Sequence, residues 1–189
     1  MPSIFVIISS IIALISPLVY ASAILKGNAK PHRTTRLVLL VITTISTLAL
    51  LAAGNRVAVW LAGVSMIQSV LIFALSIKFG MGGWSRIDIL CLLIAITGII
   101  LWRTTNNPRL ALYFSIAADF TGVIPTIIKT YRLPKTEVWS FFLLDVFAAI
   151  FSLLAIRSWV LEDYAFPLYI LLVNSLMVML IITPRPPQK

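Results

Sequence analysis

The chain has one cysteine, one histidine and six acidic residues, and each of these shortages excludes a kind of protein. A single cysteine, Cys91, cannot form a disulfide within one chain, and a metal site built on it would need further ligands. The only histidine, His32, lies in a predicted loop, and no HExxH, GxSxG or Cys–His pairing is present. We therefore expect no enzyme activity, no cofactor and no metal.

Charge is also scarce, and long apolar runs take its place. Charged residues are 11% of the chain, against about 25% in an ordinary soluble domain, and 60% of the residues are hydrophobic. About 20 apolar residues suffice to cross a bilayer. Seven apolar stretches occur, over residues 3–25, 37–54, 57–77, 87–102, 108–131, 138–157 and 164–183. The sequence therefore predicts an all-α integral membrane protein with seven transmembrane helices and no soluble domain.

The fifteen Lys and Arg residues divide unequally when the seven stretches are threaded alternately through a membrane. One side receives four, which are Arg56, Arg103, Arg109 and Arg157. The other receives eleven, which are Lys26, Lys30, Arg33, Arg36, Lys78, Arg86, Lys129, Arg132, Lys135, Arg185 and Lys189. Because cytoplasmic loops retain Lys and Arg, we predict that the N-terminus lies outside and the C-terminus in the cytoplasm.

The formal net charge of +9 raises the question of nucleic acid. The basic residues flank the apolar stretches, as anionic lipid headgroups favour, and no basic run is interleaved with aromatic residues. We therefore expect the lipid bilayer, and no nucleic acid, as their partner. No Lys or Arg precedes Lys26, so the first stretch lacks the charged region of a signal peptide and is interpreted as a retained helix.

Prolines and amides recur at similar spacing in the first three and the last three stretches. The matching pairs are Pro17 with Pro125, Pro31 with Pro134, and Gln68 with Asn174, at shifts of 108, 103 and 106 residues. Any two apolar helices that contain a proline look alike, but several pairs at similar shifts favour duplication. We predict two parallel three-helix repeats, residues 1–80 and 107–189, joined by a linker helix in 81–106, a 3+1+3 arrangement.

These residues resemble the SWEET and PQ-loop superfamily, in which a proline in the first helix of each unit is usually followed by glutamine and a basic stretch. Pro125-Thr126-Ile127-Ile128-Lys129 fits this pattern with Thr126 in the place of glutamine, and Pro17-Leu18 fits it less closely. Residues 24–35 resemble bacterial PQ-loop-like proteins more than plant sugar carriers. The resemblance implies a 3+1+3 protein of the bacterial cytoplasmic membrane that transports a small polar solute by alternating access.

The resemblance has one clear departure. The sugar carriers have prolines in the first two helices of both units, whereas stretches 37–54 and 138–157 contain none. Sugar specificity and the carriers' gating are therefore not implied.

Four polar side chains lie near the middle of predicted spans, namely Gln68, Asp119, Asp145 and Asn174. An aspartate at the centre of a span costs about 2.5–3.5 kcal/mol on insertion scales, so intramembrane carboxylates are functional candidates. They could instead bond neighbouring helices, as amides also do. In the resembling sugar carriers, asparagines on the third and seventh helices line the substrate site. Asn174 matches that pattern and Gln68 is a longer amide. We predict all four as substrate-binding residues and Asp119 as the candidate for proton coupling.

Three further residues are predicted as hinges. Pro17 and Pro125 each remove a backbone donor and clash with the preceding turn, and Gly122 permits bending or close packing beside Pro125. A static kink is the alternative for both prolines.

The expected function is transport of a small polar solute, such as a sugar, an amino acid or a vitamin-like compound, with or without proton coupling. A receptor or sorting protein on the same fold is the alternative, and a structural membrane protein is a third. A receptor for a peptide carboxylate needs several basic residues in its cavity, whereas the predicted mid-helix charges are acidic. The sequence leaves a homo-oligomer open.

Overall fold

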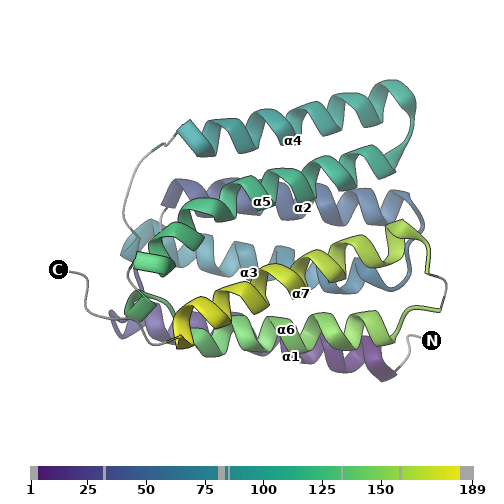
Figure 1. Ribbon diagram of the computed structural model, residues 1–189. Helices are drawn as coiled ribbons and strands as arrows, with labels where there is room; N and C mark the ends of the chain where they lie inside the picture. The colour runs from purple at the N-terminus through teal and green to yellow at the C-terminus, as the bar shows by residue number, and fades with distance from the viewer. Residues whose placement is uncertain are drawn as a thin grey trace.

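The computed structural model describes residues 4–31, 33–80, 84, 86–132, 134–157 and 159–183. In these residues all regular secondary structure is helical, with seven α-helices and one 3-10 turn. They are α1 (Ile4–Leu25), α2 (Arg33–Ala52), α3 (Ala58–Phe79), α4 (Arg86–Thr105), α5 (Pro108–Arg132), η1 (Pro134–Thr136), α6 (Trp139–Leu154) and α7 (Leu161–Ile182). The helices run side by side as one bundle, and α1 begins at the end of the bundle opposite to the end of α7 (Figure 1). The predicted all-α fold with seven helices is confirmed.

Six of these helices are long and apolar enough to cross a membrane, namely α1, α2, α3, α4, α5 and α7. The remaining helix, α6, is apolar but has only 16 residues, about 24 Å at 1.5 Å per residue. Their composition supports an integral membrane protein. The side of the membrane on which each terminus lies stays a prediction.

Two helices begin earlier than the apolar pattern predicts. The helix predicted from residue 37 begins at Arg33, and the one predicted from residue 164 begins at Leu161. In both cases the added turn carries charged side chains that bond neighbouring helices. Arg33 Nε donates to the Ser76 carbonyl at 3.1 Å, and Glu162 forms an ion pair with Arg109 at 2.7 Å. These contacts stabilise turns that hydropathy assigns to loops.

The helices pack in a regular order. Helix α3 packs against both α1 and α2, and α7 packs against both α5 and α6. The two groups meet where α1 contacts α6 and where α2 contacts α5, and α3 also contacts α7. Helix α4 lies on the outside of the bundle, mainly against α5 (Figure 1). A Cβ on Gly98 would lie 2.6 Å from Phe114 Cβ, so glycine is needed for this close approach of α4 to α5.

Serine hydroxyls join the helices at the two interfaces between these groups. Ser46 and Ser115 share a hydrogen bond of 2.7 Å between α2 and α5, and both side chains are buried. Between α1 and α6, Ser9 Oγ donates to the Ala148 carbonyl at 2.7 Å and Ser16 Oγ to the Phe141 carbonyl at 3.3 Å. Small hydroxyl residues allow close packing of membrane helices and satisfy polar groups there. Both interfaces are therefore held by buried hydroxyl hydrogen bonds as well as by apolar packing.

Candidate functional site

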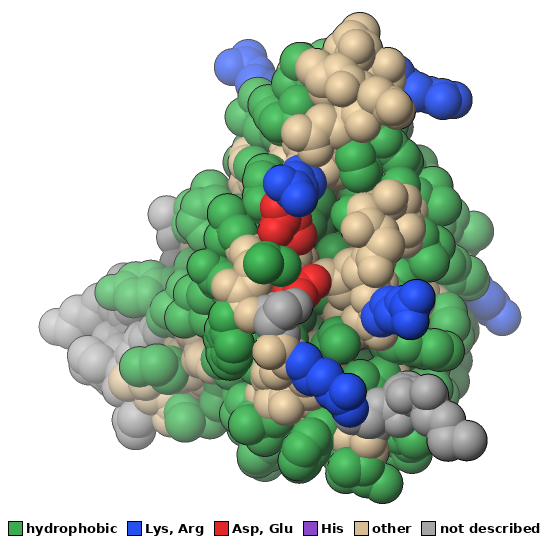
Figure 2. All heavy atoms as spheres, turned by 90° about the vertical axis from the view of Figure 1, so that its right-hand side faces the viewer, with side chains coloured by type: hydrophobic (Ala, Val, Ile, Leu, Met, Phe, Trp, Pro, Cys, Tyr) green, Lys and Arg blue, Asp and Glu red, His purple; other side chains and the backbone are tan. Residues whose placement is uncertain are grey.

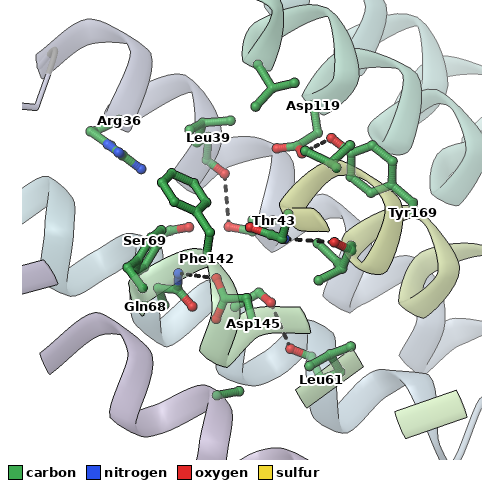
Figure 3. Close-up of a pocket in the computed structure, with 17 residues that line it drawn as sticks. Arg36, Leu39, Thr43, Leu61, Gln68, Ser69, Asp119, Phe142, Asp145 and Tyr169 are labelled. Carbon is green, nitrogen blue, oxygen red and sulfur yellow. Dashed lines mark hydrogen bonds between the residues drawn. The ribbon is translucent and has the colours of Figure 1, made fainter. Parts of the chain in front are cut away.

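A cavity of about 120 Å³ lies between the helices and is lined by side chains from every helix except α4 and η1. A cavity of this size has room for several waters or a small solute. The lining side chains that carry charge or an amide or phenol group are Arg36, Gln68, Asp119, Asp145, Tyr169 and Asn174. These side chains converge from α2, α3, α5, α6 and α7 (Figure 3). The site is therefore built from residues far apart in the sequence.

All four residues predicted from the sequence as substrate-binding lie at this cavity. Gln68 comes from α3, Asp119 from α5, Asp145 from α6 and Asn174 from α7. The structure brings them together, and their role in binding stays a prediction.

Asp145 and Gln68 form one polar pair of the cavity. Gln68 Nε2 donates to Asp145 Oδ2 at 3.3 Å, which connects α3 to α6. Protein N–H···O bonds are usually 2.9–3.0 Å long, so this bond is at the long, weaker end of the range. The Asp145 side chain is buried, yet both residues line the cavity. A carboxylate has about four acceptor positions, so Asp145 is able to accept further hydrogen bonds from a solute.

Asp119 and Tyr169 form the second polar pair. Tyr169 Oη donates to Asp119 Oδ2, which connects α5 to α7. The Arg36 guanidinium attracts the Asp119 carboxyl from across the cavity, and Figure 3 shows these two residues on opposite sides of it. Asp119 lies eleven residues after Pro108, about 16 Å along α5. Its carboxyl is therefore far from the beginning of its helix and is stabilised by a phenol and a distant cation.

Arg36 is the functional candidate that the sequence reasoning missed. It was assigned to a loop, but it is in the first turn of α2 and lines the cavity. Arg36 Nη2 donates to Tyr20 Oη at 3.2 Å, and the guanidinium carbon lies 5.2 Å from the centre of the Tyr20 ring. Hydropathy missed it because a charged first turn interrupts the apolar pattern from which the helix was predicted. The cavity therefore carries a basic side chain from a helix end in addition to the acidic mid-helix charges that the sequence predicts.

Asn174 and three hydroxyl residues complete the polar lining. Asn174 Nδ2 donates to the Ile170 carbonyl of its own helix at 2.8 Å. Thr43 and Ser65 likewise donate to carbonyls of their own helices, each at 2.9 Å, and Ser69 lines the cavity beside them. Such back-bonded hydroxyls keep their lone pairs as acceptors. The cavity therefore offers a cation, two carboxyls, amides and hydroxyl acceptors to a solute.

A second set of polar contacts lies at the end of the bundle where α1, α3, α5 and α7 begin. We call Asn55, Arg109, Glu162 and Asp163 the outer network. Asn55 Nδ2 donates to Asp163 Oδ1 at 2.6 Å and to the Glu162 carbonyl at 3.2 Å, and Arg109 pairs with Glu162. Figure 2 faces this end of the bundle and shows acidic side chains near its middle, beside basic ones. The network ties the α2–α3 connection to α5 and α7.

Asn55 also organises the beginning of α3. Its Oδ1 accepts the backbone N–H groups of Val57 at 3.0 Å and Ala58 at 2.7 Å. The first N–H groups of a helix lack partners within it, so this side chain satisfies two groups that would otherwise be unpaired. Asn55 is itself buried, and one side chain therefore serves both α3 and the outer network.

The predicted hinge residues lie within continuous helices. Helix α1 continues through Pro17, which is buried, and α5 continues through position 125, although the side chain of Pro125 lies outside the described part of the structure. A Cβ on Gly122 would lie 3.3 Å from Cys91 Sγ. Gly122 thus allows close packing of α5 on α4, and a bending role for all three residues stays a prediction.

Comparisons with protein-family models, with curated proteins and with solved structures find no match. Among the residues that the structure describes, no group of three or more His, Cys, Asp or Glu is placed to hold a metal ion. The fold and cavity define a helical membrane protein with a polar central site, and the resemblance to the SWEET and PQ-loop superfamily stays a prediction.

Proposed function

We propose that this protein transports a small polar solute across the membrane by alternating access, as its resemblance to the SWEET and PQ-loop superfamily implies. The observation that carries the proposal is the cavity, which gathers polar and ionisable side chains from five helices of a bundle made largely of membrane spans. Charged groups within membrane spans are costly, and they usually mark a solute or ion pathway. A structural protein would have no use for several of them facing one space.

The packing of the helices supports two equivalent moving units, α1–α3 and α5–α7, with α4 as the linker. If α1, α2 and α3 are exchanged for α5, α6 and α7, the contact between α1 and α6 becomes the contact between α5 and α2. The contacts of α3 within the first unit likewise become those of α7 within the second. This is the pattern expected for parallel repeats related by an axis along the membrane normal.

The two ends of the cavity differ in the polar groups beside them, which supports a gated pathway. Toward one end the lining reaches Leu61, the fourth residue of α3, and the polar side chains near the beginning of that helix are those of the outer network, in which Asn55 bonds Asp163. At the other end the lining reaches Arg36 and Phe142, each the fourth residue of its helix and so about 5 Å from the helix end. By the predicted topology that end is cytoplasmic. In this proposal the conformation is closed to the outside, and opening outward requires the outer network to separate.

The charges of the cavity favour a zwitterionic solute over a neutral sugar. Arg36 matches a carboxylate, and Asp119 or Asp145 matches an ammonium group. The volume of about 120 Å³ is below the 300–1,000 Å³ of typical ligand sites, so the solute is small or the cavity widens when it binds. Proton coupling is supported by Asp119, whose carboxyl has a phenol donor and not a close cation as its bonded partner.

The proposal is tested by a thermal-shift screen of the purified protein against sugars, amino acids and vitamins, followed by uptake of the stabilising compound into proteoliposomes. A ligand at a hundredfold excess over its Kd stabilises the folded state by about 2.7 kcal/mol. Asp145→Asn should remove this stabilisation. Asp88→Asn is the matched control, because Asp88 is a buried carboxyl outside the cavity that accepts a hydrogen bond from Thr35 at 2.9 Å. An equal loss in both variants would contradict the assignment of the cavity as the site.

A receptor or sorting protein is the second candidate, and the presence of Arg36 in the cavity is the observation that favours it. Such a protein binds a carboxylate without moving it across the membrane. Stabilisation by a ligand without any uptake of that ligand would favour the receptor over the transporter.

A further inference from the structure

A groove of about 410 Å³ runs along the bundle between the first halves of α5 and α7. Its walls are Tyr113, Ile116, Ala117, Phe120, Leu161, Ala165 and Tyr169. The small side chains of Ala117 and Ala165 leave the space, and the aromatic side chains of Tyr113, Phe120 and Tyr169 lie around it. The groove is almost entirely apolar, and it lies beside the central cavity, which Tyr169 also lines.

The position of the groove determines what fills it. Both helices are candidate membrane spans, so the surroundings of the groove are the acyl chains of the bilayer. A bound water needs two to four polar partners, which this lining does not supply. From Leu161 to Tyr169 the groove follows α7 over eight residue-to-residue rises, about 12 Å. One leaflet of a hydrocarbon core of about 30 Å is about 15 Å deep, so the groove matches one leaflet.

A cation lies at the membrane-surface end of the groove. Arg109 is four residues before Tyr113 in α5, so both side chains lie on the same face of the helix. The Arg109 side chain is 61% exposed, and its Nε pairs with Glu162 at 2.7 Å, which holds the guanidinium in place. Arginine has four further N–H donors, arranged to bind phosphate oxygens in pairs. An apolar groove one leaflet deep with a guanidinium at its mouth is complementary to a phospholipid.

We propose that a membrane phospholipid binds at this position, with one acyl chain in the groove between α5 and α7 and its phosphate at Arg109. The bound chain ends against the Tyr169 ring, whose hydroxyl donates to Asp119 in the central cavity. The lipid therefore restrains the side chain that separates the bilayer from the polar site. Loss of the lipid frees the Tyr169 ring to move, and with it the phenol partner of Asp119.

Photochemical crosslinking in membranes tests this site. The full chain is reconstituted in vesicles of phosphatidylethanolamine and phosphatidylglycerol that contain a trace of phosphatidylglycerol with a photoreactive acyl chain. After irradiation, mass spectrometry maps the labelled residues. We expect labelling to concentrate in 113–120 and 161–169. Ala117→Trp fills the groove and should lower labelling of 161–169 about fivefold or more. The matched control, Ile96→Trp, places the same side chain on the exposed face of α4 and should change nothing.

The headgroup contact is tested with the double variant Arg109→Gln and Glu162→Gln, which removes the ion pair without leaving either charge unpaired. We expect labelling of the groove by the phosphatidylglycerol probe to fall, while labelling of exposed α4 residues stays the same. Equal labelling of all membrane-facing helices, or undiminished labelling of the groove in a monodisperse Ala117→Trp protein, would overturn the proposal and leave only ordinary contact with bulk lipid.

Discussion

Asp119 and Asp145 face the same cavity, but their partners differ in kind. Asp145 is bonded by the amide of Gln68, and Asp119 is bonded by the phenol of Tyr169 with Arg36 across the cavity. Both donors stabilise the charged form of the carboxyl that they bond, and Arg36 adds its attraction at Asp119. Protonation of Asp119 would weaken its bond to Tyr169 and so act on the contact between α5 and α7, whereas protonation of Asp145 would act on the contact between α3 and α6.

Asp119→Asn should abolish uptake driven by a pH gradient and preserve exchange of solute across proteoliposomes. Asparagine keeps the Oδ1 acceptor for the Tyr169 hydroxyl, so we expect the free energy of unfolding to change by less than about 1 kcal/mol. Asp88→Asn is again the control, since it removes a buried carboxyl outside the cavity. Full gradient-driven uptake by a folded Asp119→Asn protein would exclude this residue as the proton carrier.

Arg36→Gln tests the charge of the solute. Glutamine can still donate to Tyr20 Oη, but it removes the positive charge from the cavity. A lost hydrogen bond to a charged group is worth about 1.5–3 kcal/mol, so the affinity for a solute with a carboxylate should fall roughly 10- to 150-fold. Arg36→Lys should retain part of the affinity, because lysine keeps the positive charge. It should not retain all of it, because lysine lacks the planar guanidinium that bonds both oxygens of a carboxylate. If the Arg36→Gln protein binds the solute as tightly as the unchanged protein does, the solute is neutral or cationic.

At the scale of the helices, the beginning of α3 and the beginning of α7 are joined through one asparagine. Asn55 satisfies backbone groups of α3 with its oxygen and holds Asp163 with its nitrogen. Movement of the two units against each other has to separate the bonds of Asn55 to α7, whose donor is held in place by the bonds of the same side chain to the beginning of α3. Such a contact is able to keep one conformation dominant until the solute binds.

Asn55→Asp separates the two tasks of this side chain. Aspartate keeps an oxygen for the Val57 and Ala58 N–H groups, but it loses the donor and puts a negative charge beside Asp163. We expect the outer end to open, so that a cysteine in place of the cavity residue Ser65, in a protein with Cys91→Ala, reacts about tenfold faster with an impermeant reagent from outside.

Asn55→Ala is the companion variant. It removes the bonds to the Val57 and Ala58 N–H groups and also the bonds to Glu162 and Asp163. It should also destabilise the protein by about 0.5–2 kcal/mol, as loss of a helix-capping residue does. If neither variant changes the labelling of the cysteine at position 65, the outer network does not gate the cavity.

At the scale of the whole molecule, the odd number of helices determines the topology. Since α1 begins at one end of the bundle and α7 ends at the other, we expect the two termini on opposite sides of the membrane (Figure 1). The distribution of Lys and Arg then selects the direction. The cytoplasmic assignment of the end that carries Arg36 depends on this direction.

Cysteine labelling tests the topology directly. The chain has a single cysteine, Cys91, which is buried, so Cys91→Ala gives a cysteine-free background. A cysteine at Asn106, in the connection between α4 and α5, should react with an impermeant reagent from outside intact cells. One at Asn28, in the connection between α1 and α2, should react only after the membrane is opened. The reverse pattern would contradict the predicted orientation and place Arg36 at the outer end.

Hydropathy predicted the helices well because each span is a long apolar segment, a property local to the sequence. The four polar residues Gln68, Asp119, Asp145 and Asn174 were visible for the same reason, as they interrupt apolar runs. Tyr169 was missed because a tyrosine is half apolar and does not stand out in a membrane helix. The contact of Asn55 with Asp163 joins residues 108 positions apart. It depends on how the helices pack, which no local pattern contains.

The shortness of α6 has a consequence for the bilayer itself. Its 16 residues span about 24 Å, against a hydrocarbon core of about 30 Å, and it begins with Trp139, which is exposed as an interfacial anchor would be. Lipids beside α6 must compress or the helix ends must recruit polar headgroups inward, and each ångström of mismatch costs a fraction of a kcal/mol. If α6 spans the membrane with its neighbours, we therefore expect the bilayer to be thinner along the flank that α6 forms. A motion that tilts α6 would change this deformation, so membrane thickness becomes one of the variables that set the balance between its conformations.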